Sequence, residues 1–307
     1  MLFGAKNYNY AAFRRDVAMK DLGSTRSRQT GGPRPGDLAP NFEARTLDGE
    51  KFRLSRLRGK SNLVLTFGSA TCPFTAASIQ RTNSLYEKYA DQDVEFLFVY
   101  VREAHPGERT PAHRSIEDKI RSAKTFRDQE RLEGEVVVDD LTGSMHRKYG
   151  GLPNPTFLID KSGRIAFRCL WTRPRIVDRA LQQLLEIQEE RGVDHAIVLG
   201  GEDVSVPMLS GFLHTHRALE RGGMDSIRNF RSQMGRGGHA RELASRVMQP
   251  ATLHPAGALT AILLTGGVLA GGLLLGRRLR RERLDSLRRP YSYQTRGSAE
   301  GEYAVGI

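Results

Sequence analysis

The chain has 307 residues, of which 39% are hydrophobic and 27% are charged, and it contains two cysteines. This length allows one or two globular domains with a sizeable core, and the composition excludes collagen-like, disulfide-rich and fully disordered chains. The net charge of +12 lies mainly at the two ends: residues 1–35 carry seven Lys or Arg against two Asp or Glu, and residues 277–307 carry eight against four. Because no basic stripe with interleaved aromatic residues runs through the middle, we expect no nucleic-acid binding.

Residues 1–35 are polar, basic and rich in glycine, and they are predicted to form a flexible segment without a packed core. The pattern changes at about residue 36. Asn62–Phe67 (NLVLTF) and Val94–Val101 (VEFLFVYV) are short apolar runs that predict buried strands. Apolar residues at helical intervals over 76–90 predict a helix that joins the two strands, so this region is predicted to form a βαβ unit.

The same alternation continues to residue 188. The sequence predicts, in order, a helix over 115–126, a strand over 136–138, a hairpin of strands over 156–160 and 165–170, and a helix over 176–188. Ser115 is a suitable N-cap for the first of these helices, and acidic residues in its first turn suit the positive end of the dipole. Residues 36–188 are therefore predicted to form an α/β domain with a mixed sheet and flanking helices.

The part of the chain after residue 188 is predicted to be different in kind. Residues 189–254 show little periodicity beyond a predicted helix over 207–219, and we interpret them as an accessory or stalk segment. Residues 255–276 contain an uncharged run, Ala256–Gly276, long enough to cross a bilayer, which predicts a single transmembrane helix. Residues 277–307 then form a basic C-terminal tail.

Two arguments about the membrane side disagree. The arginines that follow the apolar segment favour a cytoplasmic tail and an external catalytic domain. No signal peptide is visible that would export the preceding residues, which favours a cytoplasmic catalytic domain with a C-terminal anchor, and this is the arrangement we expect. The spacing of Gly267 and Gly271 would let two such helices approach closely, so the segment also predicts a homodimer.

Cys72 is the residue most suited to chemistry. It lies in FGSATCPFT, just after a predicted strand and at the start of a predicted helix, where backbone N–H groups and the helix dipole favour a thiolate nucleophile. The alternative is an inert buried cysteine. Thr75 occupies the second-cysteine position of a CxxC motif, so an external thiol reductant or a distant thiol is required. Cys169 is the one internal candidate, although buried cysteines are more often structural.

Residues 36–188 resemble the thioredoxin superfamily, in particular its redoxin branch. In that fold a cis-proline packs against the reactive cysteine, and Pro155 has the corresponding place in chain order. The peroxiredoxin signature is met in part, because Ser69 lies three residues before Cys72 but Leu65 stands where that family has a proline. The resemblance therefore leaves a peroxidase open.

Four segments resemble the iodothyronine deiodinases in the same order and spacing. They are LVLTFGSATCPF (63–74), FLFVYVREAHP (96–106), HRSIEDKIRSA (113–123) and DDLTGSMHRKYGGLP (139–153). In that family the position of Cys72 holds a selenocysteine, which attacks iodine and removes it reductively from an aromatic ring. This chain departs from the family in having sulfur there and in its predicted anchor, which is C-terminal rather than N-terminal.

The resemblance also implies roles for other residues. Glu103 and His105 would form the proton-handling site, and His113 would bind the substrate. A histidine near a carboxylate at the end of a strand can deliver a proton near neutral pH, which agrees with this assignment; the alternative is a pair of ordinary loop histidines. We also expect Thr71 and Pro155 in the substrate-binding part of the site.

Three functions remain open on the sequence. The first is a thiol-dependent reductive dehalogenase that acts on iodinated aromatic molecules. The second is a one-cysteine thiol peroxidase or disulfide reductase, and the third is a redox-inactive binding module with the same fold. In the first two, a small-molecule substrate and an external thiol reductant are the expected partners. We expect no bound cofactor and no metal, because the sequence contains no nucleotide-binding or metal-ligating motif.

Overall fold

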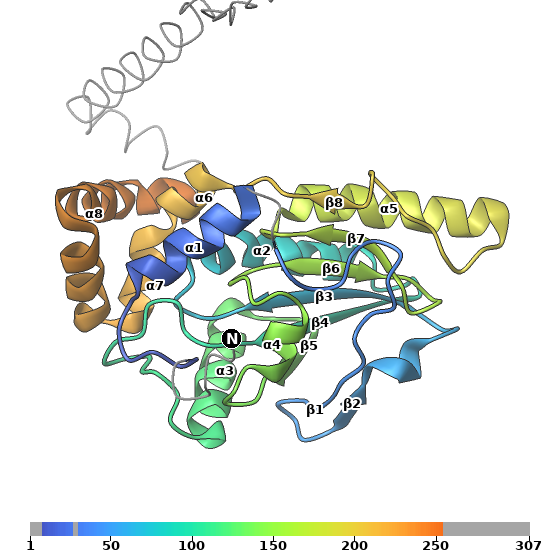
Figure 1. Cartoon of the computed structure of the whole chain (residues 1–307), viewed down its shortest axis with the longest axis horizontal. Helices are drawn as coiled ribbons and strands as arrows, with labels where there is room; N and C mark the ends of the chain where they lie inside the picture. The colour runs from blue at the N-terminus through green and yellow to red at the C-terminus, as the bar shows by residue number, and fades with distance from the viewer. Residues whose placement is uncertain (1–7, 27–29, 254–307) are drawn as a thin grey trace, which may run out of the picture. The chain divides into compact units, whose positions relative to one another are not determined.

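The computed structural model describes residues 8–26 and 30–253, and its centre is a six-stranded mixed sheet (Figure 1). The strand order is β5-β4-β3-β6-β7-β8. In chain order the strands are β3 (Asn62–Gly68), β4 (Val94–Tyr100), β5 (Glu135–Val138), β6 (Thr156–Ile159), β7 (Ile165–Cys169) and β8 (Glu202–Asp203). Strands β3, β4 and β5 are parallel, whereas β6 runs antiparallel to both β3 and β7. This is the predicted thioredoxin-like α/β sheet.

Both faces of the sheet are covered, which explains why β3 and β4 are apolar throughout. Leu63, Leu65 and Phe67 of β3 belong to a core cluster with α4 (Ser144–Lys148), the hairpin of β1 (Glu43–Arg45) and β2 (Lys51–Arg53), and the 3-10 helix Leu54–Leu57. The opposite face packs against α2 (Pro73–Lys88), α3 (Ile116–Glu130) and α5 (Pro174–Arg191).

The elements predicted over residues 36–188 are confirmed, with ends that differ by a few residues. Helix α3 begins where the sequence predicts it, because Ser115 and Asp118 form a capping box: each side chain accepts a hydrogen bond from the other residue's backbone N–H. Helix α2 begins three residues earlier than predicted, at Pro73, since proline fits the first position of a helix.

Residues 1–35 were predicted to form a flexible segment without a packed core, and this prediction is wrong for residues 8–26. Residues Arg15–Arg26 form helix α1, and the preceding Phe13 is buried against Leu219, Ile227 and Phe230. These partners lie more than 200 positions further along the chain, so no local pattern could reveal the contact.

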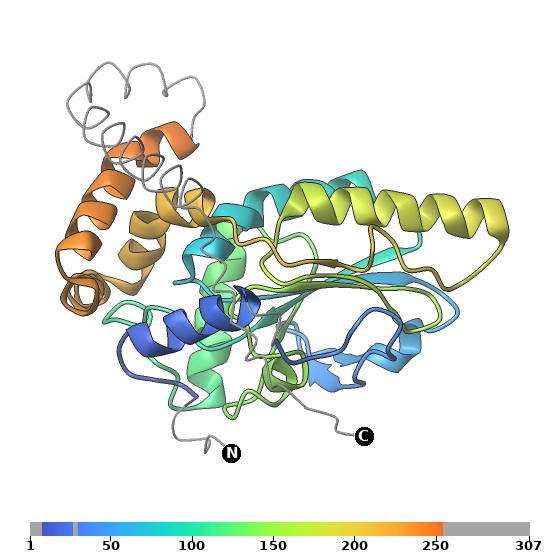
Figure 2. The same ribbon diagram turned by 45° about the horizontal axis from the view of Figure 1, so that its top comes forward.

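The segment predicted as an accessory or stalk is also helical. It contains α6 (Met208–Leu213), α7 (Thr215–Gly222) and α8 (Met224–Leu253), where one helix over 207–219 was predicted. Gly235 kinks α8 with a φ of 60°, a conformation that glycine adopts without strain. Helices α1, α6, α7 and α8 gather at one end of the sheet (Figure 2).

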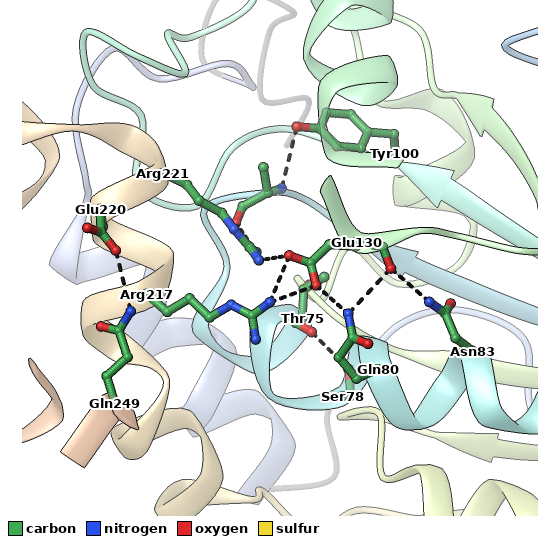
Figure 3. Close-up of polar contacts among 11 residues, drawn as sticks. Thr75, Ser78, Gln80, Asn83, Tyr100, Glu130, Arg217, Glu220, Arg221 and Gln249 are labelled. Atoms are coloured by element: carbon green, nitrogen blue, oxygen red, sulfur yellow. Dashed lines mark hydrogen bonds and ion pairs between the residues drawn. The ribbon is translucent and has the colours of Figure 1, made fainter. Parts of the chain in front are cut away.

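A buried carboxylate joins α7 to the sheet domain (Figure 3). Glu130, at the end of α3, accepts hydrogen bonds from Arg217 at 2.9 and 3.0 Å, from Gln80 at 3.0 Å and from Arg221. The Arg221 guanidinium also donates to the carbonyl oxygen of Ala70 at 3.1 Å. Helix α7 is therefore connected to the loop that leads to Cys72.

No helix within residues 8–26 and 30–253 has the length and apolar character needed to span a bilayer. The predicted transmembrane segment 255–276 and the basic tail 277–307 lie outside the described residues. The predictions of membrane anchoring and of a homodimer through this segment therefore stay predictions.

Candidate active site

Cys72 lies at the junction of β3 and α2. The strand ends at Gly68, a short loop follows, and Cys72 is the N-cap residue of the helix that begins at Pro73. A side chain at Gly68 would place its Cβ 2.6 Å from the Phe98 ring and 2.7 Å from the Thr75 hydroxyl, so glycine permits the close approach of strand and helix. This is the arrangement predicted from the sequence.

The cysteine borders a cavity of about 90 Å³. Most of its walls are apolar or aromatic, and they come from three parts of the chain. The sheet domain contributes Cys72, Phe74, Val101, His105, Pro153 and Trp171; the N-terminal segment contributes Phe13, Val17, Met19 and Leu22; and the C-terminal helices contribute Met208, Phe230, Met234 and Arg241. Residues on both sides of the kink in α8 therefore reach the same cavity.

Burial of Cys72 overturns the expectation, drawn from the sequence, that the start of the helix favours its thiolate form. The residue is 1% exposed, and burial raises the pKa of its thiol above the ordinary value. The backbone N–H groups of Phe74 and Thr75 lower the pKa, as expected at a helix N-terminus, but their effect is smaller. The thiol is therefore mainly protonated at neutral pH while the cavity is closed.

Glu103 is the centre of a buried hydrogen-bond network behind the cavity. Its carboxylate accepts from the Thr71 backbone N–H at 2.9 Å, from the Thr71 hydroxyl at 2.6 Å and from the Tyr100 hydroxyl. The Thr71 hydroxyl in turn accepts from the backbone N–H of His105 at 3.0 Å. Burial raises the pKa of Glu103. The network connects the residue before Cys72 to the loop after β4, so it positions both the cysteine and His105.

The His105 ring lines the cavity and stacks on Phe13, with ring centroids 4.4 Å apart. Its Nδ1 is buried without a hydrogen-bond partner among the described residues. Burial and the nearby Arg241 lower the pKa of His105 to about 3. The closed cavity therefore favours the neutral imidazole at neutral pH, because an imidazolium there would be desolvated beside another cation.

The histidine that faces Glu103 is His113. Its Nε2 lies 3.7 Å from the Glu103 carboxylate, beyond hydrogen-bond distance, and burial lowers its pKa to about 3. Neither His113 nor Thr71 is among the residues that line the cavity. Their predicted contact with the substrate stays a prediction; the structure places both side chains behind the cavity wall, beside Glu103.

Pro155 is also outside the cavity wall, which Pro153 joins instead. The described residues contain no cis peptide bond, so the cis-proline implied by the thioredoxin resemblance is not present. Hydrogen bonds anchor this segment to its neighbours: the Phe67 backbone N–H donates to the Pro155 carbonyl at 2.9 Å, and the Thr172 backbone N–H donates to the Asn154 carbonyl at 2.8 Å. A trans bond before proline is also the more stable isomer in general.

Cys169 has the surroundings of a core residue. It is buried in β7, its thiol donates to the Trp171 carbonyl at 3.0 Å, and burial raises its pKa. Both cysteines are free thiols. No group of three His, Cys, Asp or Glu side chains that could hold a metal occurs in the described ranges.

Sequence reasoning missed most of the cavity wall. Phe74 and Trp171 could have been noticed, because they lie beside Cys72 and just after the predicted hairpin. Phe13, Phe230 and Arg241 carried no local signal, since each lies in a segment without clear apolar periodicity.

Phe13 closes the cavity over His105, which makes it a direct test of access. In the Phe13→Ala variant we expect iodoacetamide to alkylate Cys72 at least about tenfold faster, because loss of the stacked ring favours local opening of the cover. The rate is measured by mass spectrometry of the Cys72 peptide. Arg15→Ala, an exposed substitution in the same segment, should leave it unchanged. Equal rates in the two variants would contradict a covering role for Phe13.

A mixed thioredoxin-like sheet with a cysteine at the start of the helix after its central strand β3 places this domain in the thioredoxin-fold class. Residues 22–172 match the family model of iodothyronine deiodinase. This part of the chain is therefore similar to the iodothyronine deiodinases, which agrees with the resemblance of the sequence motifs.

Curated relatives agree. The chain is 35% identical over 144 residues to thyroxine 5-deiodinase of Ovis aries, covering 43% of this chain and 48% of the relative. It is 33% identical over 145 residues to thyroxine 5-deiodinase of Homo sapiens, covering 43% and 46%. The chain thus spans about half the length of the relatives that it matches.

Solved structures with a similar fold are more distant in sequence. A thioredoxin-family thiol:disulfide interchange protein from Chlorobium tepidum is 19% identical, with a TM-score of 0.39, and the match covers 50% of this chain and 98% of that one. Peroxidoxin BcpB from Mycobacterium tuberculosis is 20% identical, with the same TM-score and the same two coverages.

Proposed function

We propose that this protein is a thiol-dependent reductive dehalogenase of iodinated aromatic molecules, with Cys72 as the nucleophile. The observation that carries the proposal is the position of Cys72, at the N-terminus of α2 and in the wall of an aromatic cavity. The family match of residues 22–172 supports the same reaction class. An apolar wall with few polar groups is typical of a site for a small organic molecule.

The reaction balances with two equivalents of an external thiol. The Cys72 thiolate attacks iodine, an S–I bond forms, and the C–I bond breaks with its electron pair left on carbon, which takes up a proton. The first reductant thiol then attacks the Cys72 sulfur, releasing iodide and a proton and forming a mixed disulfide. The second reductant thiol attacks the mixed disulfide, which gives a free disulfide and restores Cys72. The carbon is reduced by two electrons, and two thiols are oxidised.

The remaining groups would serve proton transfer and geometry. Of the two residues predicted to handle protons, His105 is the one that lines the cavity. Its neutral ring has one N–H to donate and one lone pair to accept a proton. Glu103 acts at a distance, because it holds Thr71 and, through the Thr71 hydroxyl, the backbone of His105. In this proposal Glu103 is a positioning residue, and His113 packs beside the Glu103 carboxylate.

The test is iodide release from 3-iodotyrosine and 2-iodophenol by the purified full chain with excess dithiothreitol. We expect release that is abolished in Cys72→Ser and retained in Cys169→Ser, because Cys72 lines the cavity and Cys169 does not. Absence of release in wild type, with Cys72-dependent consumption of hydrogen peroxide, would instead assign a one-cysteine peroxidase. Absence of both activities would favour a binding module.

A further inference from the structure

Two arginines line the Cys72 cavity: Arg102, on which the charge of Asp21 acts, and Arg241, which has no carboxylate partner among the described residues. Arg241 of α8 lines the cavity, and its guanidinium donates to the Thr215 hydroxyl at 2.9 Å and to the Gly211 carbonyl at 3.4 Å. The guanidinium also lies 5.8 Å from the centroid of the Phe230 ring. Among the described residues it forms no ion pair, so neutral groups alone satisfy it.

Several other arginines of α7 and α8 differ from Arg241 in that they form ion pairs with carboxylates. Arg231, on the same helix, pairs with Glu242, and both Arg217 and Arg221 pair with Glu130. Burial lowers the pKa of Arg241, which reflects the cost of removing its charge from water. An anion in the cavity would offset that cost and occupy the free donors of the guanidinium.

A second polar group in the same cavity also lacks a partner. The Nδ1 atom of His105 is buried and makes no hydrogen bond to the described residues. A carboxylate that accepts from Arg241 could also accept an N–H from the neutral imidazole. The one carboxylate in the described cavity wall, Asp21, does not compete for this role, since the charge that acts on it most strongly is that of Arg102.

We propose that the Cys72 cavity contains an anion subsite formed by Arg241 and His105, and that its ligand is an aromatic carboxylate. The carboxylate binds at the α8 side, and the aromatic ring lies among Phe74, Trp171 and Cys72. This subsite deepens the proposed function, and the reaction of its ligand rests on that function; binding of the ligand can be measured without any reaction. Arg241 lies outside residues 22–172, so the subsite belongs to the added helices rather than to the matched domain.

Trp171 provides the readout, because it is the one tryptophan of the chain and it lines the cavity. Its fluorescence is titrated with 4-hydroxy-3-iodophenylacetate and with the primary amide of the same acid, which differs in charge alone. Full-length Cys72→Ser protein is used, so that no reaction accompanies binding. We expect the acid to bind about 10- to 100-fold more tightly than the amide, the range for a hydrogen bond to a charged group.

In Arg241→Met this preference should fall to within about twofold, while Arg246→Met, an exposed substitution five residues further along α8, should keep it. Equal affinities for acid and amide with Arg241 present would overturn the proposal, and this result does not depend on whether Arg241→Met folds. A preference that survives in folded Arg241→Met would also overturn it.

Failure of the proposed function gives a different result. In that case iodide release is absent while the acid preference persists, which supports the subsite without the reaction. Iodide release from both compounds, with equal affinity for acid and amide, supports the reaction and removes the subsite.

Discussion

Replacement of Glu130 by alanine is expected to lower the free energy of unfolding by about 3–5 kcal/mol, the usual cost of removing one partner from a buried ion pair. The Glu130 side chain is 2% exposed, and those of Arg217 and Arg221 are 18% and 12% exposed. Without the carboxylate, two largely buried guanidinium groups would lie next to each other with no ion-pair partner among the described residues. Repulsion between them adds to the loss of their hydrogen bonds.

Urea unfolding followed by Trp171 fluorescence measures this loss. Glu133→Ala is the matched control, since Glu133 is exposed and lies three residues further along the chain. We expect that control to stay within about 0.5 kcal/mol of wild type. A change below about 1 kcal/mol in Glu130→Ala would show that water reaches the arginines, and that the cluster in Figure 3 is not the attachment point of α7.

The second large effect is the dependence of Cys72 reactivity on pH. Burial raises the pKa of this thiol, so the reactive thiolate is a minor species at pH 7 and its fraction grows about tenfold per pH unit. Between pH 7 and pH 9 we therefore expect the rate of alkylation by iodoacetamide to rise about 100-fold without a plateau.

Cys169→Ser protein is suited to this measurement, because Cys72 is then the one remaining cysteine. The rate is followed by loss of free thiol. A plateau below pH 8 would contradict the dominant role of burial, and it would mean that the N–H groups at the start of α2 control the pKa, as the sequence alone suggests.

Local patterns predicted the sheet domain well, for identifiable reasons. The apolar runs of β3 and β4 reflect burial on both faces, and the Ser115 capping box uses residues three positions apart, so both features are visible within a few residues. Cys72 was predicted in the same way, from a strand, a proline and a helix in sequence. The contact of Thr71 with Glu103 spans 32 positions and was not foreseen.

Long-range packing set the limits of prediction. The pKa of Cys72 was predicted in the wrong direction because the helix-end rule is local, whereas its burial also depends on α1 and α8. Phe13 and Phe230 meet over more than 200 positions, and each appears unremarkable in its own segment. Arg241 has a role only once the cavity exists, so no spacing rule applied to α8 could identify it.

The wall of the cavity that Cys72 borders has two parts, one inside the family-matched residues and one outside them. The first part, here called the floor, lies within residues 22–172 and includes Cys72, Phe74, His105 and Trp171. The second part, here called the roof, lies outside them and includes Phe13 and the side chains of α8. Substitutions in the roof can therefore change which molecules reach the sulfur without altering the sulfur's immediate surroundings. Selectivity and reactivity are separable here, and each can evolve, or be engineered, while the other stays fixed.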